Sequence, residues 1–411
     1  MLMPLVTVIV LTGAAQSVSD ERTRAEQLAR AGKNAEAIEL FKQVVQQDPA
    51  DTEARLWIAR LDLRGGRTAN AEAGFRSVLR DHPADVDAKI GLAAALLRKG
   101  AASEALTILV EAEPAAGQNA DLFSVLARAY RRTGDDRRAL EYFKRARALS
   151  PDDPDIASGY EAVALAYGHS ITFSGFHEWG SENVHTSSEA FATSVRVAPR
   201  LHLDGGLHLE QRSGASDTVA GGGFLWRMTR ASNLEFHALG GPDNTLLPAS
   251  DVSAGSVNYV GACEWGGNAR RLSFPGVRVV ALSPIFAWDR GRTRLDSRYT
   301  YSRGRFDGRF TAERRGAAAT DDTTGDHSFM ARETWRGWRR ASLNVGYAYG
   351  IESFEDLTVD RIGSLGASTV SFGGRFDLPS LTMITATYEH QWRSNSTTMG
   401  RLTLALVQFF P

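Results

Sequence analysis

Charged and apolar residues alternate along two neighbouring stretches, 292–303 and 305–314. Alternation places successive side chains of a strand on opposite faces, so each stretch would present one charged face and one apolar face. In a membrane barrel the charged faces line the lumen, where rings of charge select polar or ionic cargo. The candidate lumen-lining residues are Arg294, Asp296, Arg298, Arg305, Asp307 and Arg309.

These residues have a second interpretation. Opposite charges on adjacent strands also form cross-strand ion pairs that fill a closed interior. A barrel of about 12 to 14 strands lies between the sizes that side chains fill and the sizes that leave an aqueous channel. We therefore prefer the interpretation in which ion pairs fill the interior to the one in which the charges line a channel. Both interpretations stay open.

A catalytic site would need a nucleophile, a base and a group that orients the base. His177 beside Glu178, and His390 near Ser394 and Asn395, are the nearest combinations, and neither lies in a recognisable motif. The sequence has no P-loop, GxGxxG, HExxH or cluster of Cys and His ligands. We expect no enzyme activity, no cofactor and no bound metal, and keep a barrel enzyme as a distant alternative.

Composition limits the classes of partner. The 411 residues carry 47 basic and 48 acidic side chains, so the net charge gives no reason to expect nucleic acid. Glycine is frequent, at 39 residues, and concentrates after residue 170, which suits the tight turns and crowded interior of a barrel. No stretch reaches the roughly 18 apolar residues that a membrane helix needs.

The N-terminus has the pattern of a secretory signal. Residues 5–11 form a short apolar run, and Gly13 and Ala15 supply the small residues of a cleavage site. We therefore assign residues 1–15 to a signal peptide, with the mature chain starting near Gln16, although residues 1–4 contain no Lys or Arg.

An internal repeat occupies residues 21–167. Glycines recur every 34 residues, an alanine follows each glycine by five positions, and a large apolar residue follows four positions later. This pattern resembles tetratricopeptide repeats, in which each repeat is a pair of helices. Glycine would end the first helix in a left-handed turn, alanine would let the helices approach, and the large residue would fill the gap. The landmarks are Gly32, Ala37, Phe41, Gly66, Ala71, Phe75, Gly100, Ala105, Leu109, Gly134, Ala139 and Phe143.

Four such repeats, with a capping helix near residues 156–166, predict an α-solenoid whose concave face binds a protein or peptide. A basic run along the last repeat could contact an acidic polymer or lipid headgroups. Acidic residues are interspersed, so an ordinary solvated face is the simpler interpretation. The run comprises Arg128, Arg131, Arg132, Arg137, Arg138, Lys144, Arg145 and Arg147.

Beyond residue 167 the helical period gives way to strands. The predicted strands are 169–180, 187–198, 200–211, 218–230, 232–240, 253–263, 275–288, 292–303, 305–314, 326–336, 340–352, 364–376, 380–392 and 401–410. Residues 168–411 therefore predict an antiparallel transmembrane β-barrel of about 14 strands, within a range of 12 to 16. The fold class is two-domain, α-solenoid then all-β barrel. A soluble β-sandwich or propeller is the alternative, and the lack of a blade-length repeat argues against a propeller.

The connections between these strands differ in length. Pro199 with Arg200, and Gly304 alone, would form very short turns, whereas residues 315–326 and 354–363 would form long polar loops. Short turns on one rim and long loops on the other are typical of outer-membrane barrels.

One Gly- and Pro-rich stretch runs from Gly240-Gly241-Pro242-Asp243 to Leu247-Pro248 and leads to a strand with Val252, Ala254 and Tyr259. This stretch, together with the order of the two domains, resembles the YaiO family of outer-membrane β-barrel proteins. The chain is also similar in architecture to exopolysaccharide-export proteins, in which periplasmic repeats precede an outer-membrane pore. The resemblance implies the outer membrane of a Gram-negative bacterium, with the repeats in the periplasm.

We therefore expect a barrel that contacts outer-membrane lipid and serves export or passage of a polysaccharide or small solute. Its repeats would recruit a periplasmic or inner-membrane protein that the sequence does not identify. The alternative is a non-conducting barrel that anchors a periplasmic interaction scaffold.

Overall fold

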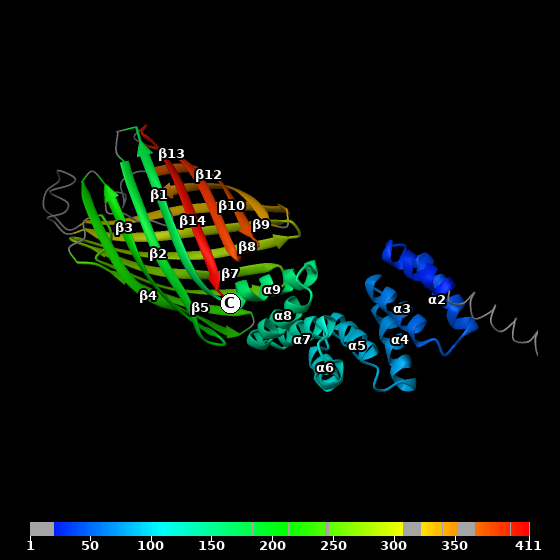
Figure 1. The fold of residues 1–411 in the computed structure, drawn as a ribbon. Coiled ribbons are helices and arrows are strands. Elements are labelled where there is room, and N and C mark those ends of the chain that lie inside the picture. Colours follow the sequence, from blue (N-terminus) through cyan, green and yellow to red (C-terminus); the bar gives the residue numbers. More distant parts are fainter. Residues whose placement is uncertain are drawn as a thin grey trace, which may run out of the picture. The chain divides into compact units, whose positions relative to one another are not determined.

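The computed structural model describes residues 20–181, 185–212, 214–229, 231–242, 246–306, 322–338, 340–351, 366–394 and 396–410. The predicted signal segment, residues 1–15, lies outside these ranges. The chain divides into two compact units, with the boundary between Val163 and Ala164 (Figure 1). No helix among the described residues combines the length and the apolar character needed to cross a membrane.

The N-terminal part consists of paired helices, as the 34-residue period predicts. Residues 20–30 are helical, and they are followed by α2 (Asn34–Gln47), α3 (Thr52–Arg64), α4 (Thr68–Asp81), α5 (Val86–Lys99), α6 (Ala102–Ala116), α7 (Ala120–Thr133), α8 (Asp136–Leu149) and α9 (Pro154–Tyr167). Asp51, Asp85 and Asn119 cap the first helices of successive repeats. Each side chain accepts a hydrogen bond of 2.8 to 2.9 Å from the backbone N–H three residues on, which satisfies a group that the helix start leaves unpaired.

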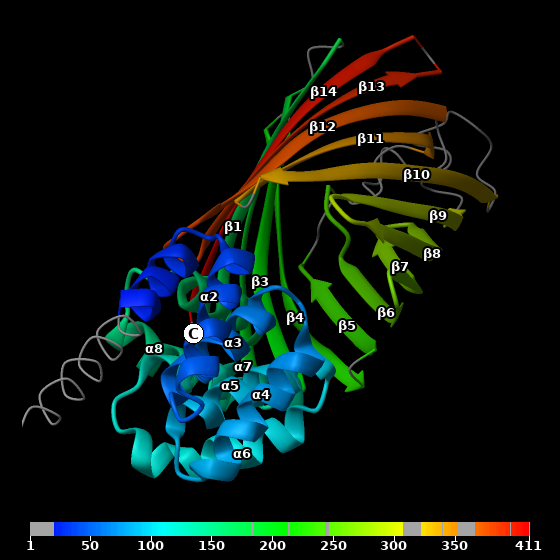
Figure 2. The same ribbon diagram turned by 90° about the vertical axis from the view of Figure 1, so that its right-hand side faces the viewer.

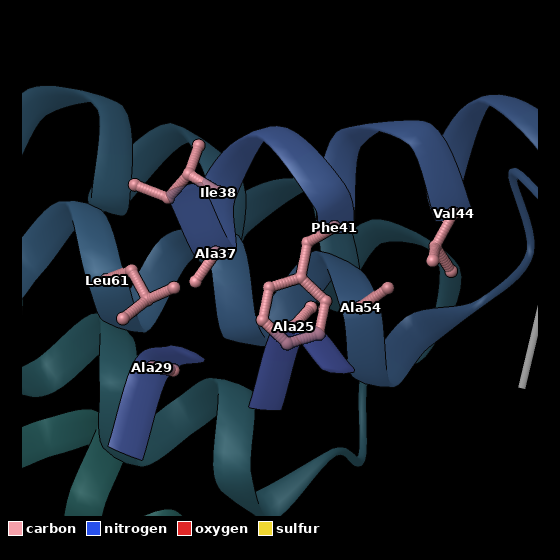
Figure 3. Close-up of a cluster of buried hydrophobic side chains, with 8 residues drawn as sticks. All are labelled: Ala25, Ala29, Ala37, Ile38, Phe41, Val44, Ala54 and Leu61. Atoms are coloured by element: carbon pink, nitrogen blue, oxygen red, sulfur yellow. The ribbon is translucent and has the colours of Figure 1, made fainter. Parts of the chain in front are cut away.

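The landmark glycines lie in left-handed turns between the two helices of each repeat. Their φ angles are 78° at Gly32 and Gly66, 88° at Gly100 and 90° at Gly134, a conformation that glycine adopts at little cost. The landmark alanines and large apolar residues are at most 1% exposed, so they form the contacts between helices. Figure 3 shows the first of these contacts, in which Phe41 lies close to Ala25 and Ala54.

Close packing between repeats also requires a small residue in the first helix. A Cβ atom built on Gly91 of α5 would lie 2.3 Å from the ring of Phe75, and one on Gly159 of α9 would lie 2.5 Å from the ring of Phe143. These distances are well inside van der Waals contact, so each ring occupies the space that a side chain would fill.

Pro114 does not end its helix. It lies inside α6, which continues to Ala116 before Gly117 turns with a φ of 60°. In the other three repeats a proline stands 17 residues after the landmark glycine. Here Gly117 occupies that position and ends the helix instead.

The second unit is a closed antiparallel barrel of 14 strands, which confirms the predicted fold class (Figures 1 and 2). Each strand pairs with its neighbours in sequence, and β14 pairs with β1 to close the sheet. The strands are β1 (His169–Gly180), β2 (His185–Ala198), β3 (Leu201–Arg212), β4 (Ala215–Thr229), β5 (Ser232–Gly240), β6 (Ser250–Val260), β7 (Cys263–Phe274), β8 (Val277–Arg290), β9 (Thr293–Phe306), β10 (Asp322–Trp338), β11 (Ala341–Ile351), β12 (Gly366–Leu378), β13 (Thr382–Arg393) and β14 (Thr398–Phe410).

The two ends of the barrel differ in their connections. The end that carries His169 and Phe410, here called the proximal end, has short turns such as 199–200 and 291–292. The longest connections, 241–249, 307–321 and 352–365, all lie at the other, distal end. The predicted loop 354–363, and residues 315–321 of the other predicted loop, lie outside the described residues.

The strand count agrees with the prediction because two errors compensate. The predicted strands omit β7, whose centre contains Gly266 and Gly267 and has no clear apolar alternation. They also break β9 at Gly304, where a single glycine was expected to turn the chain. Gly304 instead pairs with Val279, and the strand continues to Phe306. The predicted strand 305–314 is therefore wrong at its start, and residues 307–314 lie outside the described residues.

Candidate functional site: the barrel lumen

The barrel is apolar outside and polar inside. Large apolar side chains at alternate strand positions are exposed, including Phe173 at 55%, Leu282 at 51% and Leu404 at 53%. Charged and hydroxyl side chains at many of the intervening positions are buried. Soluble proteins distribute these two classes in the opposite way, so the outer surface suits apolar surroundings and the lumen suits polar groups.

Buried polar side chains gather in the distal half of the lumen. Side chains that water barely reaches are in contact with neighbours on all sides, so this half is packed rather than open. The barrel residues with polar side chains and at most 8% exposure are Glu178, Thr186, Ser188, Glu210, Asp217, Asp251, Ser371, Gln391 and Arg401.

An ion pair across the closing seam lies at the centre of this packing. Arg401 on β14 donates hydrogen bonds from Nε and Nη2 to Oε2 of Glu178 on β1, at 3.2 and 2.8 Å. The guanidinium carbon also lies 4.3 Å from the ring centre of Phe176. Both charged side chains are only 5 to 6% exposed, so the pair offsets part of the cost of burying each charge.

Hydrogen bonds extend the network to both sides of the seam. Oγ of Ser188 on β2 lies 2.6 Å from Nε2 of His208 on β3. On the other side, Gln391 donates to Oγ1 of Thr369 at 3.1 Å and accepts from Nε of Arg393 at 3.0 Å. These contacts satisfy groups whose burial would otherwise be costly.

Residues 246 and 247, in the connection between β5 and β6, bind to the lumen wall. Oδ2 of Asp217, on β4, accepts hydrogen bonds from the backbone N–H groups of Leu246 and Leu247, the second at 3.0 Å. Leu247 is 5% exposed. Leu247 and Pro248 end the Gly- and Pro-rich stretch noted in the sequence. Asp217 therefore holds this stretch at the distal mouth.

The wall formed by β7 to β9 is apolar at the same level. Its inward side chains form a cluster in which every member is at most 5% exposed, comprising Leu272, Phe274, Val277, Val279 and Phe306. The distal lumen is thus filled by apolar packing on one side and by a polar network on the other.

The proximal half of the lumen is more accessible and is organised by Arg294. Its guanidinium donates to Glu264 at 2.7 Å, to Asp296 at 2.7 Å and to Asp289 at 3.2 Å. The four side chains are 20 to 38% exposed, so solvent reaches this ion-pair cluster. The proximal half of the lumen is therefore charged and accessible to solvent, unlike the packed distal half.

The structure separates the predicted lumen-lining residues. Arg294, Asp296 and Arg298 occupy inward positions of β9, and the first two form the ion pair just described. Asp307 and Arg309 lie outside the described residues.

The prediction that Arg305 lines the lumen is wrong. Because β9 runs unbroken through Gly304, Arg305 falls on the same face as Tyr299 and Tyr301, which are 41% and 36% exposed on the outer surface. A turn at Gly304 would have started a new strand, in which Arg305 could face the lumen. Because β9 continues instead, its alternation of inward and outward side chains places Arg305 on the outside.

Of the combinations considered for catalysis, His177 and Glu178 do not come together. His177 faces outward with Nδ1 3.0 Å from Oγ of Ser187, whereas its neighbour Glu178 faces the lumen and pairs with Arg401. His390 lies on the outer face, with 4.6 Å between its ring centre and that of Trp392; Asn395 lies outside the described residues. Within the described ranges, no group of three or more His, Cys, Asp or Glu could hold a metal ion.

The network of the distal lumen was not predictable from the residues alone. Glu178 was noted only as a neighbour of His177, and Arg401 and Asp217 were not singled out. The one usable signal is strand alternation, which places Glu178 and Arg401 opposite their apolar neighbours Trp179 and Leu402.

The basic run of the last helical repeat divides into paired and exposed side chains. Arg145 donates to Glu113 at 2.9 Å and lies 3.8 Å from the ring centre of Phe123. Arg128, Arg131 and Arg132 of α7 are exposed and form no ion pair with other described residues. With Arg137 and Lys144 of α8, which are also exposed and form no ion pair with the residues that the structure describes, these three are the part of the run that a partner could contact.

A tyrosine shares the Glu113 carboxylate with Arg145. The hydroxyl of Tyr142 donates to Oε2 of Glu113 at 2.8 Å. Burial of this hydroxyl, together with its bond to the carboxylate, raises the pKa of Tyr142 to about 12, because both disfavour the phenolate.

Comparisons with known proteins bear on the helical part of the chain. The tetratricopeptide repeat family matches residues 23–167, so the N-terminal region is a set of tetratricopeptide repeats. The search of curated proteins gives no match.

Several solved structures are similar to this region. A thermophilic tetratricopeptide repeat protein of Thermus thermophilus is 26% identical, with 36% of this chain and 82% of that chain covered and a TM-score of 0.34. MamA of Desulfovibrio magneticus RS-1 is 21% identical, with 36% and 84% covered and a TM-score of 0.31. Pseudomonas aeruginosa pilF is 16% identical, with 38% and 70% covered and a TM-score of 0.34.

Proposed function

We propose that this chain is an outer-membrane β-barrel protein that passes a polysaccharide or small polar solute and recruits a protein partner through periplasmic repeats. The observation that carries the proposal is the reversed polarity of the barrel, with apolar side chains exposed and charged side chains buried. A closed barrel also pairs its backbone groups within the sheet, as a strand structure in lipid requires.

The proposal places the proximal end in the periplasm. Bacterial barrels carry short turns on the periplasmic side and longer loops on the outside, and the long connections here are distal. The shortest strand, β5, has 9 residues, which is about the number that crosses a bilayer when the strand is tilted. The helical repeats lead into β1 at the proximal end, which is consistent with a periplasmic repeat domain.

A polar cargo fits the accessible part of the lumen. The Arg294 cluster offers guanidinium and carboxylate groups that exchange hydrogen bonds with hydroxyl-rich molecules. The domain order that the chain shares with exopolysaccharide-export proteins makes a polysaccharide one candidate, and a small polar solute is the other. Passage would require the packed distal half to rearrange, and the Asp217 contact with residues 246–247 is where such a change would begin.

The second candidate is a non-conducting anchor for a periplasmic interaction scaffold. The filled distal lumen favours it, because Glu178, Gln391 and Arg401 are each at most 4% exposed there. In this case the tetratricopeptide repeats, which bind proteins or peptides in general, would carry the function.

Planar-bilayer conductance separates these candidates. The full-length protein is compared with a variant that removes both members of the seam pair, Glu178→Ala with Arg401→Ala. Removing both avoids a buried unpaired charge and empties part of the distal lumen. We expect low conductance in the unaltered protein and a severalfold rise in the double variant.

The matched control removes an exposed pair at the proximal rim, Arg375→Ala with Asp377→Ala, whose atoms lie 2.9 Å apart. This variant should conduct like the unaltered protein. If the seam variant folds into a heat-modifiable barrel and still conducts no more than the control, the anchor becomes the better account.

A further inference from the structure

Four arginines lie together on the outer face of the barrel near its distal rim. Arg271 of β7, Arg278 of β8 and Arg303 and Arg305 of β9 take outward positions, because they alternate with the buried residues of the apolar cluster. All four are exposed. This is the side of the sheet that elsewhere presents large apolar side chains.

The pairing register brings these arginines close to one another. Arg278 lies directly opposite Arg305, and Val280 lies between Arg271 and Arg303 in the next row. Residues directly opposite each other have Cβ atoms about 5 Å apart, and like charges in that position destabilise a sheet. An anion bound at this place would offset the repulsion.

The protein does not supply that anion to three of the four side chains. Arg271, Arg278 and Arg303 form no ion pair with the residues that the structure describes. The adjacent Arg270 is the contrast, because it points inward and donates to both carboxylate oxygens of Asp251, at 3.0 and 2.7 Å. The inward Arg270 therefore has a carboxylate partner within the barrel, whereas the outward Arg271, Arg278 and Arg303 form no ion pair with described residues.

An apolar groove lies next to the arginines on the same face. It has a volume of about 450 Å³ and crosses β5 to β8, where small residues sit between larger ones. Ala269 and Leu282, which line the groove, lie two positions along their strands from Arg271 and Val280. The groove therefore starts at the next row of outward side chains beside the arginines. Its outward lining comprises Leu234, Ala254, Ser256, Gly267, Ala269, Leu282 and Pro284.

From this juxtaposition we infer that the outer face of β7 to β9 binds a phosphorylated, acylated glycolipid, the lipopolysaccharide of the outer leaflet. Guanidinium groups form paired hydrogen bonds with phosphate oxygens, and the groove accepts an acyl chain. The inference rests on the proposed outer-membrane location with the distal end outward. It assigns a lipid class to a surface that plays no part in the lumen.

The test uses full-length protein purified in detergent and purified lipopolysaccharide as the probe. Binding is measured by native mass spectrometry and by the rise in unfolding temperature. The distal variant carries Arg271→Gln, Arg278→Gln and Arg303→Gln. The matched control carries Arg200→Gln, Arg290→Gln and Arg292→Gln, which removes the same charge from exposed positions at the proximal rim.

We expect the distal variant to bind lipopolysaccharide at least tenfold more weakly and the proximal variant to bind like the unaltered protein. Dephosphorylated lipopolysaccharide should bind the unaltered protein as weakly as the intact lipid binds the distal variant. Equal binding by the distal variant would mean that the arginines are merely solvated. Equal loss in both variants would mean non-specific charge attraction, and either result overturns the inference.

Membrane fractionation of the same proteins keeps this inference apart from the proposed function. A protein that is found in the outer membrane and does not bind lipopolysaccharide overturns the lipid site alone. A protein that is absent from the outer membrane overturns the proposed function, whatever it binds in detergent.

Discussion

Arg401 and Glu178 meet across the seam that closes the barrel, although 223 positions separate them in the sequence. The pair joins the last strand to the first, so it can form only when all the strands between them are in place. Both side chains are almost fully buried. The contact between the two charges is therefore made only in the closed barrel, and it favours that state over an open sheet.

Breaking this pair on one side should destabilise the barrel strongly. Arg401→Met leaves the Glu178 carboxylate buried without the guanidinium that compensates it, which costs about 3 to 5 kcal/mol. Urea unfolding, followed by loss of the heat-modifiable band on a gel, measures the change. The double variant Glu178→Leu with Arg401→Met should recover most of the loss. A loss below about 1 kcal/mol in the single variant would mean that the charge is hydrated or finds another partner.

Removing the Asp217 carboxylate should release the stretch at 246–248 from the lumen wall. Asp217→Ala leaves the N–H groups of Leu246 and Leu247 without their acceptor, at a cost of about 1 to 3 kcal/mol. We expect higher bilayer conductance and faster proteolysis at this connection. Asp204→Ala, which changes a partly exposed lumen carboxylate in the proximal half of β3, is the control. Identical conductance in both variants would contradict a role for the Asp217 contact in keeping the distal mouth closed.

A methyl group at Gly91 should loosen the helical repeats. Its Cβ would overlap the ring of Phe75, and overpacking of this kind costs about 1 to 3 kcal/mol. The measurement is thermal unfolding of the full chain, followed by its helical circular dichroism. The double variant Gly91→Ala with Phe75→Leu should regain part of the loss, because leucine vacates the contested space. Unchanged unfolding of Gly91→Ala would show that the repeats absorb the methyl by shifting.

The Tyr142 hydroxyl should make the repeats sensitive to high pH. Its folded pKa of about 12 lies above the unfolded value of 10.0. It therefore contributes stability that is fully present below about pH 10 and is lost as the pH rises toward about 12. Tyr142→Phe cannot ionise, so its unfolding free energy should fall less steeply across this range. Parallel pH profiles for the two proteins would mean that the hydroxyl is not bound to Glu113 in solution.

The helical repeats were predictable because their landmarks are local. Gly66 and Gly100 recur at a fixed period, and each needs only its own turn to adopt a positive φ. The barrel class was predictable for a related reason, because each strand carries its own alternation. Register was harder: Gly304 has the composition of a turn, yet the ladder with β8 carries β9 straight through it.

The candidate site was largely beyond sequence reasoning, for a physical reason. Glu178 becomes significant only when β14 brings Arg401 beside it, and Asp217 only when a connection 30 residues later folds onto it. Such contacts follow from barrel closure, and no local pattern records them. Arg294 and its same-strand partner Asp296 were predictable as inward charges, whereas the other two partners, Glu264 and Asp289, depend on which strands are neighbours.

The central claim is that residues 169–410 form a barrel that spans the outer membrane. Membrane fractionation, followed by gel electrophoresis with and without boiling, tests it most directly. We predict that the protein is recovered in the outer-membrane fraction and migrates at a different apparent mass after heating, because a closed barrel resists unfolding by detergent. Recovery as a soluble periplasmic protein, with the same mobility before and after heating, would contradict the claim.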